Sequence, residues 1–275
     1  MRIDFTKMHG LGNDFALFEA PAAAALDGAL IRRLADRHTG IGFDQALLLE
    51  GPRRADTAVF YRIFNADGAE VEQCGNGARC IAALLAARGR ARAGVVAMDS
   101  PAGLIEARIL PEGLVAVDMG LVRFDPRSLP FDAEAEADRY RLDAAGARIE
   151  IGAVSIGNPH AVLAVESVEA ADVGRWGPAI ECHPRFPRRV NAGFMQIIDR
   201  AHIRLRVYER GAGETLACGT GACAAVAVGR RWGELDREVQ VSVRGGELRV
   251  NWNGPGEHIW LTGPAEISFA GHVEV

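Results

Sequence analysis

The feature that most constrains this chain is an internal repeat, in which a short cysteine motif occurs once in each half. Cys74-Gly75-Asn76-Gly77-Ala78 recurs as Cys218-Gly219-Thr220-Gly221-Ala222, at an offset of 144 residues (218 − 74). The same offset aligns Arg62 with Arg206, without a gap between there and the cysteines. Self-similarity over this length predicts two domains of one topology, related by a pseudo-twofold axis.

Two upstream fragments repeat in the same order. Gly12-Asn13 resembles Gly157-Asn158, and Gly42-Phe43-Asp44-Gln45 resembles Gly193-Phe194-Met195-Gln196. The length of 275 residues also favours two domains over one. We predict that residues 1–117 plus 264–275 form the N-terminal domain and that 118–263 form the C-terminal domain.

The hydrophobic pattern predicts an α+β fold. Short apolar runs with period two end at Gly, Pro or Asp, as strands do. Three helices are predicted, over Asp27–Arg37, Gly77–Arg88 and Gly221–Trp232. The last two are apolar on nearly every face, so we expect each domain to be a mostly antiparallel sheet or barrel wrapped around a central helix.

Composition excludes several classes of function. The net charge is -5 and no basic stripe stands out, so neither nucleic acid nor an anionic membrane is expected as a partner. The longest apolar stretches are too short to cross a bilayer, and the N-terminus does not resemble a signal peptide. Five cysteines in irregular spacing do not form a disulfide framework. We therefore expect a cytoplasmic protein with free thiols.

Cys74 and Cys218 are the candidate catalytic residues. Each stands beside glycines at a predicted helix start, where free N–H groups and partial positive charge stabilise a thiolate. A helix terminus contributes about 0.3–1 kcal/mol to a nearby charge, less than the roughly 1.36 kcal/mol of one pKa unit. A polar neighbour must assist, and His160 and Glu209 are the candidates. Two such thiols facing each other could remove a proton from one side of a carbon and return one on the other.

The cysteines admit other interpretations. Free cysteine is usually a small buried hydrophobe, which we accept for Cys80, Cys182 and Cys223. The cysteine spacings are loose for zinc and neither motif contains a histidine, so no metal is expected. A phosphate-binding loop lacks its Gly-Lys-Ser/Thr ending here, which leaves a substrate carboxylate as the expected anion.

Uncharged amide side chains recur near these motifs and suggest a cleft that recognises a polar zwitterion by hydrogen bonds. They are Asn13, Gln45, Asn65, Asn76, Asn158 and Asn191. Arg210 is suited to a two-pronged grip on a carboxylate, whereas the first repeat has Ala66 at that position. We therefore expect the two ends of the ligand to be treated differently.

The combined motifs closely resemble the diaminopimelate epimerase family, over essentially the whole chain. The segments that carry this resemblance are 7–15 (KMHGLGNDF), 42–45 (GFDQ), 64–68 (FNADG), 74–80 (CGNGARC), 157–162 (GNPHAV), 208–215 (YERGAGET) and 217–223 (ACGTGAC). The resemblance implies two similar domains around a cleft, often in a homodimer, and a cytoplasmic isomerase of lysine and peptidoglycan precursor synthesis. Phe269 stands where some members have Tyr at the dimer contact.

The resemblance also implies a mechanism and a set of site residues. LL- and meso-diaminopimelate are interconverted without a cofactor, with Cys74 and Cys218 as paired base and acid and with His160 and Glu209 tuning them. No lysine in the motifs offers a Schiff base to pyridoxal phosphate. The substrate-binding residues carried over from the family are Asn13, Gln45, Asn65, Gly75, Asn76, Asn158, Asn191, Glu209, Arg210, Gly219 and Thr220.

Two alternative functions remain open at this point. One is a cofactor-free racemase of the same fold that acts on proline or hydroxyproline, although the amide-rich motifs and Arg210 favour a substrate with a distal amino-acid group. The other is an amino-acid-binding protein or thiol redox sensor without turnover.

Overall fold

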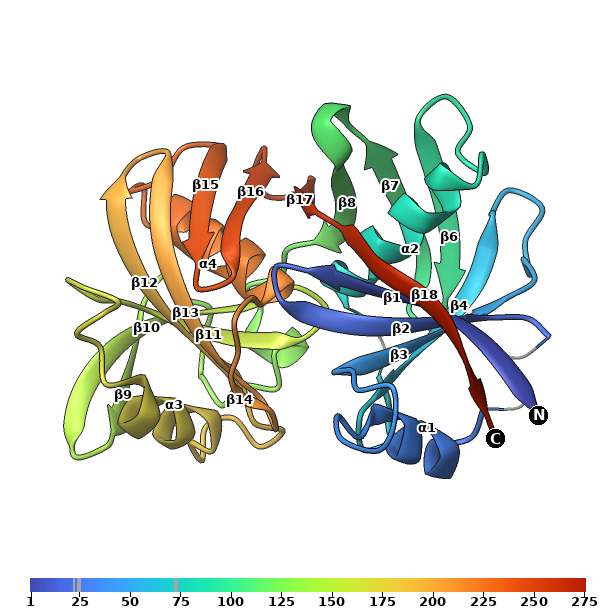
Figure 1. Cartoon of the computed structure of the whole chain (residues 1–275). Helices are drawn as coiled ribbons and strands as arrows, with labels where there is room; N and C mark the ends of the chain where they lie inside the picture. The colour runs from blue at the N-terminus through green and yellow to red at the C-terminus, as the bar shows by residue number, and fades with distance from the viewer. Residues whose placement is uncertain (22, 24–25, 72–73) are drawn as a thin grey trace. The chain divides into compact units, whose positions relative to one another are not determined.

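The computed structural model describes residues 1–21, 23, 26–71 and 74–275 and divides into two compact units (Figure 1). Unit 1 comprises Met1–Asp118 and Thr262–Val275, and unit 2 comprises Met119–Leu261. Each unit contains one copy of the cysteine motif. The chain therefore enters unit 2 once and returns to unit 1 for its last strand.

The elements of unit 1 are β1 (Arg2–Gly10), β2 (Asn13–Glu19), α1 (Gly28–Ala35), β3 (Gln45–Glu50), β4 (Val59–Asn65), β5 (Glu70–Val71), α2 (Gly75–Ala87), β6 (Val95–Ser100), β7 (Gly103–Ile109), the short turn η2 (Pro111–Gly113) and β18 (Glu266–Glu274). Those of unit 2 are η3 (Pro126–Ser128), β9 (Tyr140–Ala144), β10 (Ala147–Ser155), β11 (Pro159–Ala164), α3 (Val173–Glu181), β12 (Asn191–Asp199), β13 (His202–Glu209), β14 (Gly213–Glu214), α4 (Gly219–Arg231), β15 (Glu238–Val243) and β16 (Gly246–Trp252). Strands β8 (Leu114–Leu121) and β17 (His258–Pro264) each span a boundary between the units.

The two units have the same strand pairing. In unit 1, β1–β2, β3–β4 and β6–β7 pair antiparallel, while β2–β3 and β4–β6 pair parallel. In unit 2, β10–β11, β12–β13 and β15–β16 pair antiparallel, while β11–β12 and β13–β15 pair parallel. The predicted α+β class with mostly antiparallel sheet and a repeated topology is confirmed.

The sheet register corrects one part of the predicted repeat. In the parallel pairs, Phe15 lies opposite Gln45, and His160 lies opposite Asn191. Phe15 and His160 hold the same place, two residues after Asn13 and Asn158. Asn191 therefore occupies the position of Gln45, and the predicted match between Gln45 and Gln196 was wrong.

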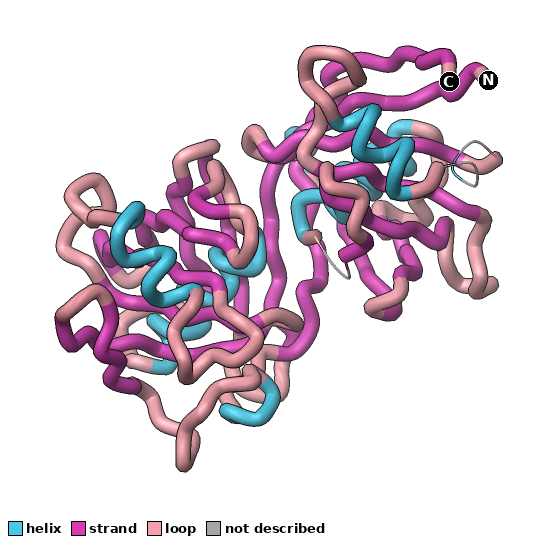
Figure 2. The backbone as a smooth tube through the Cα atoms, turned by 90° about the horizontal axis from the view of Figure 1, so that it is seen from below, coloured by secondary structure: helices cyan, strands magenta, loops and turns pink. Residues whose placement is uncertain are grey.

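A nearly all-apolar helix lies at the centre of each unit (Figures 1 and 2). Helix α2 contacts β1, β2, β6, β7 and β18, and α4 contacts β10, β11, β12, β13 and β16. Gly77 allows a close approach, since a Cβ there would lie 3.1 Å from a methyl group of Leu47. Both faces of the inner strands are covered, which explains why β3 has consecutive buried apolar residues rather than alternating apolar and polar ones.

The opposite face of each sheet is covered by a shorter helix. Ile31 and Leu34 of α1 pack with Phe18 and Leu48 in one core cluster, and Asp27 caps this helix by accepting from the Leu30 amide. Its counterpart α3 was not predicted, because two glycines and Pro178 lower its helix propensity. One of those glycines is needed for packing: a Cβ on Gly177 would lie 2.4 Å from the Tyr208 ring.

Within the described part of the chain, no helix combines the length and apolar character needed to cross a membrane.

Candidate active site

Each candidate cysteine is the N-cap residue of a central helix. The sequence placed these helix starts at Gly77 and Gly221, but α2 begins at Gly75 and α4 at Gly219. Cys74 and Cys218 have extended backbone conformations, and their carbonyl oxygens accept the first helical hydrogen bonds from Ala78 and Ala222, at 2.9 and 3.0 Å. Both sulfurs thus stand at the positive end of a helix, beside the N–H groups of its first turn.

In unit 1 the Cys74 sulfur lies within a shell of amides. Asn13 Oδ1 accepts a hydrogen bond from Asn76 Nδ2 at 3.1 Å and lies 3.9 Å from Cys74 Sγ, in line to accept from the thiol. Asn13 comes directly after the tight β1–β2 turn, in which Leu11 and Gly12 both have positive φ angles of 55° and 84°. The hairpin therefore fixes where this amide stands.

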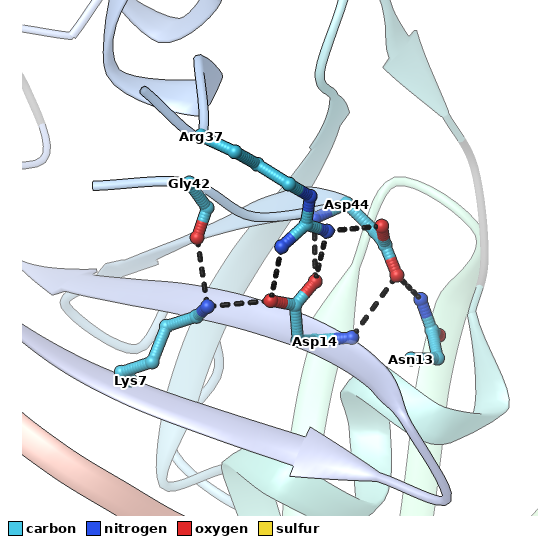
Figure 3. Close-up of polar contacts among 6 residues, drawn as sticks. All are labelled: Lys7, Asn13, Asp14, Arg37, Gly42 and Asp44. Carbon is cyan, nitrogen blue, oxygen red and sulfur yellow. Dashed lines mark hydrogen bonds and ion pairs between the residues drawn. The ribbon is translucent and has the colours of Figure 1, made fainter. Parts of the chain in front are cut away.

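A cluster of four charged residues backs the Asn13 side chain (Figure 3). Asp44 Oδ2 accepts from Asn13 Nδ2 at 3.0 Å, and Arg37 binds both Asp44 and Asp14. Lys7 Nζ donates to Asp14 at 2.5 Å and to the Gly42 carbonyl at 2.7 Å. Burial alone would raise the pKa of Asp14, but the hydrogen bonds from Arg37 and Lys7 lower it to about 2. We call Lys7, Asp14, Arg37 and Asp44 the ion cluster.

A second amide pair lies on the neighbouring strands of unit 1. Gln45 Nε2 donates to Asn65 Oδ1 at 2.8 Å, because the two residues lie opposite each other on β3 and β4. The residue after Asn65 is Ala66, which carries no polar group.

In unit 2 a continuous chain of polar contacts leads to Cys218. His160 Nε2 lies 3.0 Å from Asn158 Oδ1, and Asn158 Nδ2 donates to Thr220 Oγ1 at 3.3 Å. The Thr220 hydroxyl lies 3.6 Å from Cys218 Sγ. This chain is the counterpart of the unit 1 shell, since Asn158 corresponds to Asn13 and Thr220 to Asn76.

Cys218 also hydrogen bonds to the carboxylate of Glu209, which accepts a further hydrogen bond from Thr215 Oγ1 at 2.5 Å. Burial, followed by the negative charge of Glu209, raises the pKa of Cys218 well above its ordinary value, against a smaller opposing effect of Thr220. The resting Cys218 is therefore a thiol, and the helix terminus does not make it a thiolate.

His160 is fully buried. Burial, aided by the positive charge of Arg210, lowers its pKa to about 3, so the imidazole is neutral at physiological pH. With Asn158 Oδ1 as the acceptor, the single ring proton is assigned to Nε2.

Asn191 and Arg210 complete the unit 2 half-site. Asn191 Nδ2 donates to the Pro159 carbonyl at 3.0 Å, while its Oδ1 accepts from the Arg210 amide at 2.9 Å. The exposed Arg210 guanidinium donates to the Arg188 carbonyl at 3.2 Å. Asn191 thus orders the backbone that carries Arg210.

The predicted residues fall into separate groups of contacts within each unit. In unit 1, Asn13, Cys74 and Asn76 form one group and Gln45 pairs with Asn65. In unit 2 one group contains Asn158, His160, Glu209, Cys218 and Thr220, and Asn191 pairs with Arg210. Gly75 and Gly219 follow the cysteines at the helix starts. Sequence reasoning missed Lys7, Asp14, Arg37 and Asp44, as well as Thr215. Asp14 and Asp44 lie inside motifs that carry the family resemblance. Their place in those motifs was the signal that could have identified them as residues of the site.

The remaining cysteines lie outside these shells. Cys80 and Cys223 are fully buried on the central helices, as expected. Cys182 is exposed, so its assignment as a buried hydrophobe was wrong; it follows the last residue of α3 at the surface. Among the residues that the structure describes, no three His, Cys, Asp or Glu side chains gather as metal ligands would.

Comparisons with known proteins place this chain among epimerases. A family model described as diaminopimelate epimerase matches residues 5–124 and 152–268. Diaminopimelate epimerase from Nitrosomonas europaea is 54% identical over the full length of both chains. Two solved structures share the fold: a predicted epimerase from Pseudomonas aeruginosa (TM-score 0.72, 17% identity, 99% of each chain) and a probable proline racemase from Agrobacterium radiobacter (TM-score 0.70, 18% identity, 99% of this chain and 93% of the other).

Proposed function

This chain belongs to the diaminopimelate epimerase family, a family of isomerases, and we propose that it inverts one α-carbon of diaminopimelate, between the LL and meso forms, with two cysteines and no cofactor. The observation that carries the proposal is the 54% identity over the whole chain to a diaminopimelate epimerase. The two N-cap cysteines, one in each unit, supply the chemistry.

In the proposed mechanism, Cys74 and Cys218 act from opposite faces of the α-carbon. One sulfur removes the α-proton while the other thiol delivers its own proton, so the two cysteines exchange protonation states at each turnover. The negative charge that develops on the substrate α-carboxylate is stabilised by the free N–H groups at the starts of α2 and α4.

Glu209 prepares Cys218 for both directions. As the acceptor of the thiol hydrogen bond, it holds the proton on the line between sulfur and carboxylate. The raised pKa of Cys218 makes it a proton donor at rest. In the direction that needs Cys218 as base, the same carboxylate offers a place for its proton.

The polar residues divide the work of recognition. The amides Asn13, Gln45, Asn65 and Asn76 are proposed to bind substrate from unit 1, and Asn158, Asn191 and Thr220 from unit 2. Arg210 takes the distal carboxylate, since only unit 2 carries a guanidinium at that position. Gly75 and Gly219 contribute backbone N–H groups. The proposed functional domains are residues 1–117 plus 264–275 and residues 118–263.

We further propose that the chain acts as a homodimer in the cytoplasm, in the synthesis of lysine. Ile267 and Phe269, two positions apart on β18, are each 51% exposed, and they are the proposed contact. Analytical ultracentrifugation of the wild type and Phe269→Glu tests this contact: a dimer that becomes a monomer supports it, and a wild-type monomer contradicts it.

The experiment that tests the function is incubation of the pure protein with LL-diaminopimelate, L-proline and trans-4-hydroxyproline in separate reactions. We expect meso-diaminopimelate to form and both proline substrates to keep their configuration. Inversion of proline without inversion of diaminopimelate would favour the alternative suggested by the fold it shares with a probable proline racemase. Binding of LL-diaminopimelate without turnover would favour an amino-acid-binding protein.

A further inference from the structure

We propose that Asp44, held by the other members of the ion cluster, is a positioning residue that fixes the orientation of the Asn13 amide, so that the Asn13 carbonyl oxygen faces Cys74. The expected effect on kcat rests on the proposed function, whereas the orientation of the Asn13 amide rests on geometry alone. It assigns to the ion cluster a part in the active site that the sequence motifs did not reveal.

The first step is the direction of the hydrogen bond between Asn13 and Asp44. A carboxylate only accepts hydrogen bonds, whereas an amide side chain has one accepting and one donating end. Because Asp44 Oδ2 lies 3.0 Å from the Asn13 side chain, the donating Nδ2 must face it. Asn13 Oδ1 is thereby directed to Asn76 Nδ2 and to the Cys74 thiol.

The second step is the number of donors that converge on Asp44. Its two oxygens receive Asn13 Nδ2, the Asp14 amide and Arg37 Nη2, at 3.0, 3.1 and 2.7 Å. An asparagine at this position would have a single accepting oxygen. Its NH2 group would then face either Arg37 or the pair of donors from Asn13 and Asp14, and one contact would become repulsive.

The third step is the tie between the hairpin and the next strand. The Asp44 amide donates to Asp14 Oδ1 at 2.9 Å and to the Asp14 carbonyl at 3.0 Å. Arg37 joins the two carboxylates, and Lys7, only 10% exposed, binds Asp14 from the buried side. The other members of the cluster therefore hold Asp44 against the start of β2, where Asn13 lies (Figure 3).

The shared strand pairing does not depend on this cluster. Unit 2 has the same strand pairing, yet Pro159 stands at the position of Asp14 and Val190 at that of Asp44. Lys7 and Asp14, whose side chains are only 10% and 16% exposed, are the members that are costly to bury, whereas Arg37 and Asp44 are about half exposed. In unit 1 the group that they touch in the active site is Asn13.

A double-mutant cycle tests the proposal. We would measure kcat for LL-diaminopimelate with the wild type, Asp44→Asn, Asn13→Ala and the double variant, and check folding by thermal melting. Asp44→Asn is expected to lower kcat roughly tenfold, within the range of couplings between contacting residues. In the Asn13→Ala background it should change kcat less than about twofold, because Asp44 then has no amide to orient. A full additional tenfold loss in that background overturns the proposal, as does an unchanged kcat for Asp44→Asn alone.

A readout without turnover separates this inference from the proposed function. The side-chain 15N–1H signals of Asn13 should move in Asp44→Asn, while those of Asn158 in unit 2 should not. Arg54→Gln is the matched control, since it breaks an exposed pair with Asp56 in the same unit. An unmoved Asn13 signal overturns the inference even in an active enzyme, whereas a moved signal in a protein that does not epimerise diaminopimelate refutes only the function.

Discussion

The two half-sites place an equivalent asparagine in opposite orientations. Asn13 turns its carbonyl toward the helix start and Cys74, while Asn158 turns its NH2 group toward Thr220 and its carbonyl toward His160. In unit 1 the accepting carboxylate of Asp44 decides the orientation of Asn13, whereas in unit 2 Asn158 lies between His160 and Thr220. A duplicated fold has thus acquired two different thiol environments by changing the residues behind the amides.

The same contrast extends to the position of Glu209 in the repeat. Glu209 hydrogen bonds to Cys218, and Asn65 occupies its position in unit 1, at the same offset of 144 (209 − 65). A carboxylate favours the protonated form of a neighbouring thiol, whereas an amide carries no charge. The repeat therefore carries a carboxylate at this position in unit 2 and an uncharged amide in unit 1.

The largest effect is expected from removing either sulfur. Cys74→Ala and Cys218→Ala should each lose roughly 10²–10⁴ in kcat, because each removes one general acid or base. Epimerisation of LL-diaminopimelate in heavy water, followed by NMR, measures this loss. Cys182→Ala is the control, and near-wild-type activity in either active-site variant would break the comparison at its base.

Glu209→Gln sharpens the contrast between the two thiols. We expect kcat to fall on the order of 10²-fold, because the carboxylate that shares the Cys218 proton is gone. The pKa of Cys218 should also fall, since the negative charge of Glu209 that raises it is removed, while the Gln carbonyl oxygen can still accept from the thiol. Alkylation of Cys218 as a function of pH, read by mass spectrometry, measures that shift, with Glu238→Gln as an exposed control. A midpoint that stays in place would contradict the pairing of Glu209 with Cys218.

His160→Phe gives unit 2 the residue that unit 1 has at Phe15. The folded-state pKa of His160 is about 3, below the ordinary 6.5, so the unfolded chain binds the proton more readily. The neutral His160 therefore makes its full contribution to the free energy of unfolding above pH 6.5. That contribution falls as the pH drops toward 3, by up to about 1.36 kcal/mol per pH unit. Urea unfolding between pH 4.5 and 6.5 avoids the titration of Asp14, which lies lower. The variant should lose this slope; a slope that persists would assign it to other groups.

The smallest expected effect concerns an Arg–Glu ion pair that occurs in both units. Arg62 grips Glu70 as Arg206 grips Glu214, each through two hydrogen bonds. Arg206 is more buried and also donates to the Val168 and Ala171 carbonyls. We expect Arg206→Gln to cost about 1–2 kcal/mol and Arg62→Gln less than about 1 kcal/mol. Urea midpoints measure both, and equal costs would remove this asymmetry.

Sequence reasoning reached the fold because the repeat is gapless where it matters. From Arg62 to Ala78 and from Arg206 to Ala222 no loop length differs, so the cysteines and the ion pairs aligned at once. The match of Gln45 failed because the β3–β4 and β12–β13 hairpins differ in length. Asn65 lies 20 positions after Gln45 (65 − 45), whereas Glu209 lies 18 positions after Asn191 (209 − 191).

The site was less accessible to sequence reasoning wherever its energetics depend on burial. A cysteine at a helix start suggested a stabilised thiolate, but the desolvation of Cys218 and its contact with Glu209 act in the opposite direction and are larger. The ion cluster joins Lys7, Asp14, Arg37 and Asp44 from three separate segments. Charges so far apart along the chain are indistinguishable from surface charges until the strand register brings them together.

The central claim is that the two thiols act on one stereocentre from opposite sides. The most direct test is a crystal structure of the protein with a covalent aziridine analogue of diaminopimelate attached to one cysteine. We predict that the second sulfur lies about 3–3.5 Å from the same α-carbon, on its other face. A second sulfur that faces solvent, or a different carbon, would contradict the account.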